Sequence, residues 1–330
     1  MTSLTMQFDS INNTWSYEDQ PQMQVEVILA SRPRYSPYHK TLFTVRLRYP
    51  RPLHGEVMTH RKFGRNARSS RAVPVKTMLN EVRTIPYVPW HWGLNQSGMQ
   101  ADEECDTSVL LDPSDPHDTG WQREHAWLSA ANIAANHAEA FMNAGYHKQN
   151  PNRLLEPFSW IDTLITSTDW DNFLWLREHG AAEPHLQDLA ALVHVALEKA
   201  DIQDLGYGEW HMPYIAKSDW LAADTEAKPE GMTTDDFLLR VSSARCARIS
   251  YTPFDGNPSY ERELERYDML VTSDRVHASP TEHQATPDRA VSLDADNDPI
   301  WPSPKLHGNL TGYIQYRKLI PNECYTGSII

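Results

Sequence analysis

The chain has 330 residues, a formal net charge of −14 and a sequence pI near 5.5. An acidic chain is not expected to coat DNA or RNA, because proteins that do so carry a broad basic face. Hydrophobic residues make up 40% of the chain, with 11 Trp and 14 Tyr, which is enough to fill a large core. We find no repeat and no low-complexity linker, so we expect one domain over residues 1–330.

The N-terminal segment and the cysteines indicate the cellular compartment in which the protein is expected. The N-terminal segment lacks a basic start followed by an apolar run, and no stretch is apolar enough to cross a membrane. Cys105, Cys246 and Cys324 are odd in number and far apart, and they match neither a disulfide framework nor a zinc pattern. We therefore expect a cytoplasmic protein with no membrane partner and no metal site.

Apolar periodicity predicts the main elements. Strands are expected at residues 23–30 and 40–51, and in the second strand Leu42, Thr44 and Arg46 alternate with apolar neighbours. Helices are expected, in chain order, at residues 53–58, 78–83, 121–144, from a cap at 167–169 to 179, 184–199, from a cap at 234 to beyond 244, and 257–271.

Residues 121–144 give the clearest helical pattern, ended by Gly145. Its histidines, His125 and His137, are expected to be packed or exposed rather than metal ligands. The expected apolar stripe comprises Trp127, Leu128, Ala131, Ala134, Ala135, Ala138, Phe141 and Met142. Later in the chain, Asn257 and Pro258 are the expected N-cap and first residue of the last helix. The acidic, proline-containing segment 102–118 is expected to be a surface loop.

A local basic stretch stands out against the acidic background at residues 59–71. Uncharged donors lie between its cations. Arginine forks combined with hydroxyl groups suit a phosphate or diphosphate, although a solvated basic loop would carry the same residues. The stretch and its flank contain Arg61, Lys62, Arg65, Arg68, Arg71 and Lys76, with Asn66, Ser69 and Ser70 between them.

This stretch resembles the signature of the flavin-dependent thymidylate synthase family. That signature is Arg-His-Arg, seven residues and Ser, with an Arg two residues later. Here Thr59-His60-Arg61 takes the place of the triplet, and Asn66, Ser69 and Arg71 fall at the matching spacings.

Four further segments resemble the same family, although two of them stand near the C-terminus rather than before the signature. The chain therefore resembles a circularly permuted, phage-like variant of the family, and permutation is tolerated where termini lie close together. The four segments are Asn152-Arg153-Leu154-Leu155-Glu156-Pro157, Asn172-Phe173-Leu174-Trp175-Leu176-Arg177, Ala247-Arg248-Ile249-Ser250-Tyr251 and His277-Ala278-Ser279-Pro280-Thr281-Glu282-His283.

The resemblance implies an α+β fold with a twisted, mainly antiparallel sheet and a helical layer. It also implies an enzyme that reductively methylates dUMP to dTMP, with FAD as cofactor and NADPH and methylenetetrahydrofolate as co-substrates. No cysteine nucleophile is needed for that chemistry. Active sites in the family are shared between the subunits of a homotetramer, so we expect a homo-oligomer, and we expect His60 and Glu282 to be close in space.

The resemblance also implies roles for individual residues. Arg177 would polarise the pyrimidine, and Ser69 and His277 would lie at the reacting centre. The substrate would be a small nucleotide, and nucleic acid is not an expected partner. The residues expected to hold the nucleotide are Glu56, Ser69, Arg71, Arg153 and Arg177. Those expected to contact FAD are His60, Arg61, Asn172, Ser279 and Glu282, with Asn172 in place of a family His.

Three departures from the family pattern leave alternatives open: Thr59 for Arg, Ala67 for Glu, and Glu56 for a common Gln. A carboxylate near a phosphate is unfavourable unless a cation pairs with it. The chain can therefore instead be a related flavoenzyme that hydroxymethylates or otherwise alters a pyrimidine nucleotide, or a non-catalytic nucleotide-binding relative. Structural explanations also remain: Arg153 and Arg177 as ion-pair partners, and Ser69 as a helix cap.

Overall fold

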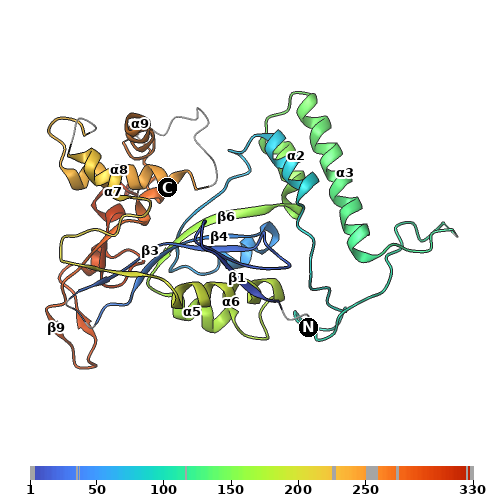
Figure 1. Cartoon of the computed structure of the whole chain (residues 1–330), viewed down its shortest axis with the longest axis horizontal. Helices are drawn as coiled ribbons and strands as arrows, with labels where there is room; N and C mark the ends of the chain where they lie inside the picture. Colours follow the sequence, from blue (N-terminus) through green and yellow to red (C-terminus); the bar gives the residue numbers. More distant parts are fainter. Residues whose placement is uncertain are drawn as a thin grey trace.

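The computed structural model describes residues 4–34, 36, 38–115, 117–224, 228–249, 259–272, 275–324 and 326–327. Within these ranges the fold is α+β, with a mainly antiparallel sheet and helices on both of its faces (Figure 1). The fold class predicted from the sequence is thus confirmed. None of the described helices is both long and apolar enough to cross a membrane.

The main sheet has the strand order β1-β2-β3-β4-β6-β5, and β7 adds to β3 as its one parallel neighbour among the described strands. Two-stranded sheets join β9 to β10 and β8 to β11. The strands are β1 (Met6–Asp9), β2 (Thr14–Tyr17), β3 (Gln24–Pro33), β4 (Leu42–Pro50), β5 (Gly64–Ala67), β6 (Trp160–Ser167), β7 (Ile202–Leu205), β8 (Ala285–Pro287), β9 (Ser292–Leu293), β10 (Pro299–Ile300) and β11 (Tyr313–Gln315).

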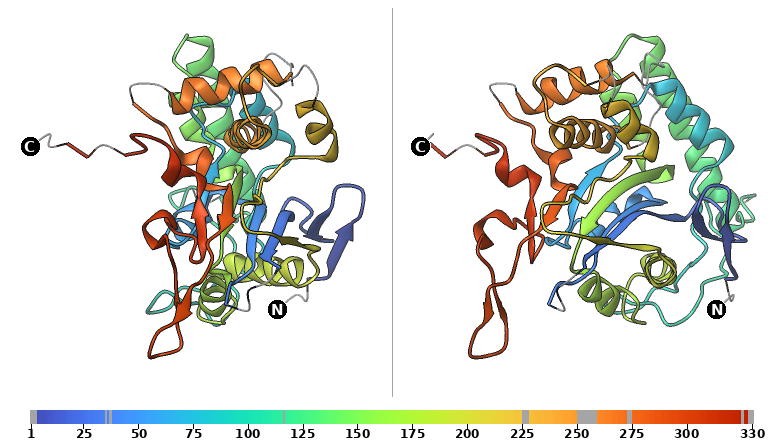
Figure 2. Two further views of the ribbon diagram at one scale, coloured as in Figure 1. Left: turned by 90° about the vertical axis from the view of Figure 1, so that its left-hand side faces the viewer. Right: turned by 60° about the vertical axis from the view of Figure 1, so that its left-hand side comes forward.

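Helices α5 and α6 lie on one face of the sheet, and α2 and α3 lie on the other, together with α7 to α9 (Figures 1 and 2). The helices are α1 (His54–Val57), α2 (Val75–Thr84), α3 (Arg123–Asn143), α4 (Gln149–Leu155), α5 (Trp170–Arg177), α6 (Pro184–Glu198), α7 (Lys217–Ala223), α8 (Thr234–Ala247) and α9 (Tyr260–Val271). Short 3₁₀ turns are η1 (Arg51–Leu53), η2 (Glu156–Phe158), η3 (Ser279–Glu282), η4 (Pro304–Leu306) and η5 (Tyr316–Leu319).

Strand β4 shows why the two faces differ. Its residues Val45, Leu47 and Tyr49 are fully buried in the core shared with α5 and α6. On the alternate positions, Arg46 and Arg48 face the other side and both contact Asp162 of β6, at 3.1 and 3.0 Å. The sheet therefore has an apolar face under α5 and α6 and an ion-paired face opposite.

Most predicted elements are confirmed, including the strands at 23–30 and 40–51 and the helices at 121–144 and 184–199. The apolar stripe predicted for α3 was too wide. Leu128 and Phe141 are 38% and 40% exposed, and it is the buried alanines of the helix that face α2. The cap of α8 is Thr233 rather than Thr234. Asn257 and Pro258 lie outside the described residues, as do the last two residues of the segment 247–251.

Candidate functional site

The basic stretch divides into a turn after α1 (residues 59–63), strand β5, and a loop (residues 68–74) that leads into α2. Two of its arginines have structural partners. Arg65 donates two hydrogen bonds of 3.0 Å, to the main-chain oxygens of Met58 and His60, and Arg68 is buried in an ion pair with Glu81. Their charge is already satisfied, so a ligand phosphate would have to use the exposed cations Arg61, Lys62 and Arg71.

The last residue of α5, Arg177, lies against the turn that follows α1. Its Nε donates to Nε2 of His60 at 3.0 Å, and its Nη2 donates to Oγ1 of Thr59 at 3.0 Å. Its Nη1 lies 3.6 Å from Oε2 of Glu56. The structure thus brings together three expected site residues, Glu56, His60 and Arg177, although over a hundred residues of chain separate α1 from the end of α5.

His60 is held in its neutral form. Because Nε2 accepts the hydrogen bond from Arg177, the ring proton belongs on Nδ1. Burial, and then the neighbouring guanidinium groups of Arg177 and Arg65, lower the pKa of His60 to about 4. Its ring packs edge-on against Phe173 of α5, with 5.0 Å between centroids. A neutral acceptor therefore fixes the arginine on this side.

The departures at positions 59 and 56 both act on the same guanidinium. Thr59 Oγ1 donates to the main-chain oxygen of Glu56 at 2.6 Å and accepts from Arg177, so its hydroxyl joins α1 to α5. Burial, followed by the charge of Glu183, raises the pKa of the Glu56 carboxyl, while Arg177 lowers it. When ionised, Glu56 neutralises part of the charge on Arg177.

A cavity of about 270 Å³ opens beside this cluster. Three of the residues expected to contact FAD, His60, Arg61 and Asn172, line it. Its volume is slightly below the roughly 300 Å³ at which small-molecule pockets begin. The cavity therefore fits one ring system of a dinucleotide rather than the whole molecule, and Arg61 and Lys62 at its edge are suited to the phosphates.

The segment 277–283 lies against β5, where it forms η3. A Cβ atom placed on Gly64 would lie 3.3 Å from Cβ of Glu282 and 3.4 Å from its main-chain oxygen. The close approach leaves little room for a side chain at this position. Glu282 therefore lies beside a residue only four positions from His60, which supports the expected proximity of the two.

Other expected residues of this segment are less enclosed. Glu282 forms an ion pair with Arg317. Ser279 Oγ lies 3.3 Å from Nδ1 of His277, and the imidazole of His277 is exposed. The segment that carries these side chains lies beside β5, but none of the three side chains lines the 270 Å³ cavity.

The other expected nucleotide-binding residues gather beyond the opposite end of β5. Ser69 and Arg71 lie on the loop after β5, and Arg153 lies on α4; all three are exposed. Asn152, fully buried, donates from one amide nitrogen to the main-chain oxygens of Ser70 at 2.7 Å and Val73 at 2.9 Å. It therefore fixes the loop that presents Ser69 and Arg71 next to α4.

Two features at this end could not be predicted from the sequence. Lys148 donates to the main-chain oxygen of Ala72 at 2.8 Å, which adds a cation to the group. Asn152 stands where the family segment has Ala, and only the fold reveals that it holds the loop. The Ser69 hydroxyl accepts from the main-chain nitrogen of Arg71 at 3.2 Å. Ser69 is not the cap of α2, whose N-cap position is Pro74.

Within one chain, the cluster around Arg177 and His60 lies apart from the group formed by Ser69, Arg71 and Arg153. Four residues of β5 separate them, which corresponds to about 13 Å of extended strand. Among the described residues, no hydrogen bond or ion pair joins Arg177 or His60 to Ser69, Arg71 or Arg153.

A buried polar chain crosses the sheet next to the site and was also not foreseen. His283 Nδ1 lies 2.8 Å from Oγ1 of Thr166, which lies 2.6 Å from Oγ1 of Thr44. His211 joins Thr44 to Ser31 at 2.8 and 2.7 Å. Burial lowers the pKa of both histidines to about 3, so they are neutral and hold the segment 277–283 on the sheet.

Cys246 is fully buried, and burial raises the pKa of its thiol. A thiol in this state is a poor nucleophile, because the thiolate is the reactive form.

Comparisons with known proteins give distant structural likeness. No family model and no curated protein matches the sequence. A UMP/dUMP methylase, PolB from Streptomyces cacaoi, is similar with 5-Br dUMP bound (TM-score 0.33, 15% identity, covering 50% of this chain and 69% of that one) and with 5-Br UMP bound (TM-score 0.35, 15% identity, 53% and 88%). The flavin-dependent thymidylate synthase ThyX from Helicobacter pylori, complexed with FAD and dUMP, is similar with TM-score 0.31 and 15% identity, covering 47% of this chain and 67% of that one. Likeness at this level does not establish a family for the chain.

Proposed function

We propose that the protein is an FAD-dependent enzyme that modifies a pyrimidine nucleotide, and that its reaction is the reductive methylation of dUMP to dTMP. The observation that carries the proposal is the contact of Arg177 with His60. These residues belong to two separate family-like segments, and a third such segment packs on Gly64 of β5. Three segments that resemble the family and lie far apart along the chain thus meet at β5 and the turn before it.

At the first end of β5, the residues suit a flavin and the reacting base. His60, Arg61 and Asn172 would hold one ring system of FAD in the cavity, with Ser279 and Glu282 at the neighbouring η3. When bound, FAD would supply hydride transfer, and the protein would bind and orient the partners. His277, exposed nearby, would lie on the path to methylenetetrahydrofolate, and NADPH would be the reductant.

Arg177 is suited to stabilising negative charge on the pyrimidine. Its guanidinium is fixed in advance by His60 and Thr59, so little reorganisation is needed when charge develops. Its unused N–H groups remain able to donate to an oxygen of the base. Ser69, Arg71 and Arg153 would bind the nucleotide phosphate at the second end of β5.

This assignment requires a second subunit, because the base-polarising arginine and the phosphate-binding group lie apart within a single chain. A homo-oligomer, and specifically a homotetramer, would place the second end of one chain's β5 against the first end of its neighbour's. Light scattering tests this requirement: an active monomer would contradict it.

A second candidate is an enzyme that hydroxymethylates or otherwise alters a different pyrimidine nucleotide. The ion pair between Glu56 and Arg177 favours it, since it places a carboxylate acceptor beside the base-binding arginine. A carboxylate accepts from the exocyclic amino group of cytosine, whereas uracil presents an oxygen there. A non-catalytic nucleotide-binding protein is the remaining alternative, and it predicts binding without turnover.

Two measurements separate these functions. The visible absorption spectrum of the purified protein tests for bound flavin. Mass spectrometry of the product then tests chemistry, with dUMP, UMP and dCMP each incubated with methylenetetrahydrofolate and NADPH. Formation of dTMP from dUMP supports the main proposal, and conversion of dCMP alone supports the second. A colourless protein that binds no FAD contradicts both.

A further inference from the structure

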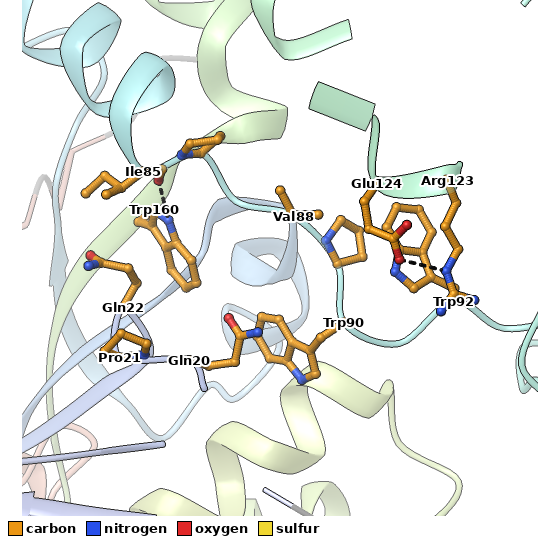
Figure 3. A pocket seen from close by; sticks show the side chains of 12 residues that line it. Gln20, Pro21, Gln22, Ile85, Val88, Trp90, Trp92, Arg123, Glu124 and Trp160 are labelled. Atoms are coloured by element: carbon orange, nitrogen blue, oxygen red, sulfur yellow. Dashed lines mark hydrogen bonds and ion pairs between the residues drawn. The ribbon is translucent and has the colours of Figure 1, made fainter. Parts of the chain in front are cut away.

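A second cavity, of about 550 Å³, lies away from the site described above, between the β2–β3 turn and the segment that follows α2. Its lining includes Trp160, at the start of β6, together with Trp90 and Pro21 (Figure 3). Pro89 adds to its wall. Its volume is within the roughly 300–1,000 Å³ range of small-molecule sites. This cavity belongs to none of the segments that resemble the family.

The indole N–H groups in this cavity are already occupied. Trp160 Nε1 donates to the main-chain oxygen of Ile85 at 3.0 Å, and Trp90 Nε1 donates to Oδ2 of Asp188 at 2.8 Å. Both rings are therefore fixed in orientation. Trp160 is only 3% exposed, so the partly exposed Trp90 is the ring that offers a ligand a flat apolar face. Rigid aromatic faces of this kind favour stacking of a planar ring.

Two glutamines supply polar groups beside the aromatic surfaces. Gln20 and Gln22 line the cavity from the β2–β3 turn (Figure 3). Both are half-buried, and within the described parts of the chain neither side-chain amide has a hydrogen-bond partner in the protein. Each amide offers one acceptor and two donors, which matches a ring whose edge carries a carbonyl next to an N–H or NH₂ group.

Charge at the rim argues against a phosphate in this cavity. Arg123 is already paired with Glu124 and with Asp106, each at 2.9 Å. Its guanidinium also lies over the ring of Trp92, at 5.6 Å from the centroid. With its one lining cation neutralised and a lining carboxylate present, the cavity favours an uncharged group.

We propose that this cavity binds an uncharged, planar heteroaromatic ring with an amide-like edge, stacked on Trp90 and hydrogen-bonded by Gln20 and Gln22. Nicotinamide, a reduced pterin and a pyrimidine nucleoside share this chemistry. The site is separate from the one proposed to bind FAD and the nucleotide phosphate, and it does not depend on that function being correct.

The test measures binding by calorimetry with three probes: nicotinamide, 6-methyltetrahydropterin and deoxyuridine. We expect at least one to bind the full-length protein at micromolar to millimolar concentration, and the one that binds most tightly identifies the source of the ring. Gln22→Ala should weaken that probe about three- to tenfold, as expected for one hydrogen bond. Trp90→Ala should weaken it at least about fivefold through lost stacking.

Two controls make the result specific. Trp220→Ala removes an exposed indole from α7, outside the cavity, and should leave the affinity unchanged. Benzyl alcohol lacks the amide edge, so its binding should be insensitive to Gln22→Ala. The proposal is overturned if no probe binds the wild-type protein, or if the probe that binds does so equally well to Gln22→Ala and Trp90→Ala. Yellow colour from bound flavin reports separately on the proposed function and is not expected to change in these variants.

Discussion

The two ends of β5 hold their charged side chains in different ways. Before the strand, Arg177 is fixed by His60, Thr59 and Glu56 and its side chain is only 19% exposed. After the strand, Arg71 and Arg153 are exposed and have no ion-pair partner among the described residues. A guanidinium fixed in advance suits the stabilisation of charge that develops during a reaction, whereas exposed arginines suit binding of a phosphate already charged in the ground state.

Substitution of Arg177 gives the largest expected effect. Arg177→Ala should retain FAD but lower the single-turnover rate of flavin oxidation, with dUMP and methylenetetrahydrofolate present, by on the order of a hundredfold or more. Arg177→Lys should restore little, because an ammonium group cannot reproduce the planar contacts to His60 and Thr59. A wild-type rate in Arg177→Ala would show that the arginine at this end is structural.

Substitution at the other end should instead act on binding. Arg71→Ala should weaken dUMP affinity by about tenfold, the size of one charged hydrogen bond, and leave the single-turnover rate at saturating dUMP nearly unchanged. Lys217→Ala, which removes an exposed cation from α7, is the matched control and should change neither quantity. A slower reaction at saturating dUMP in Arg71→Ala would remove the distinction between the two ends.

Asn152 offers a smaller and more indirect perturbation of the second end. Asn152→Ala deprives the buried oxygens of Ser70 and Val73 of their partner, which should cost about 1–3 kcal/mol of unfolding free energy. Because the loop between them carries Arg71, dUMP affinity should also fall several-fold, and the Arg177-dependent rate should not. Urea denaturation and calorimetry measure the two effects.

The control for this variant is Asn136→Ala on α3, whose exposed amide accepts from Arg83. Unfolding free energy and dUMP affinity should both stay near wild-type values. Lower stability in Asn152→Ala with unchanged dUMP affinity would mean that Asn152 supports the fold but does not position the loop.

How far the sequence leads depends on where each residue's partners lie. The alternation in β4 depends on its own sequence and was predictable. Strand β6 was missed because all eight of its residues are buried, and its polar members are satisfied by distant partners, such as Asp162 by Arg46 and Arg48. An aspartate in the centre of a sheet does not fit the apolar pattern expected of a buried strand. It is explained only by the arginines of the neighbouring strand, which the fold places beside it.

The candidate site shows the same limit. Family resemblance singled out Glu56, His60 and Arg177, which the structure brings into contact. It treated Thr59 as a lost cation, whereas in the structure the hydroxyl of Thr59 holds Arg177. The roles of Lys148 and Asn152 depend on hydrogen bonds to main-chain oxygens about eighty residues away, which leave no periodic or motif signal.

The smallest expected effect concerns acid pH at the first end of β5. The pKa of His60 is lowered to about 4, below its usual value of 6.5, so folding favours the neutral imidazole. The stability that His60 contributes should be complete above pH 6.5 and should fall as pH drops from 6.5 to about 4. The slope from one such group is at most about 1.4 kcal/mol per pH unit.

The variant His60→Gln tests this pH dependence. Glutamine does not titrate and keeps an acceptor near the position of Nε2, so His60→Gln should lose less unfolding free energy between pH 6.5 and 4 in urea denaturation. Some slope should remain, because His211 and His283 are also held neutral, with pKa values of about 3. Equal slopes in the two proteins would mean that acceptance by a neutral His60 does not help to hold Arg177, and the contrast between the two ends would then depend on Thr59 and Glu56 alone.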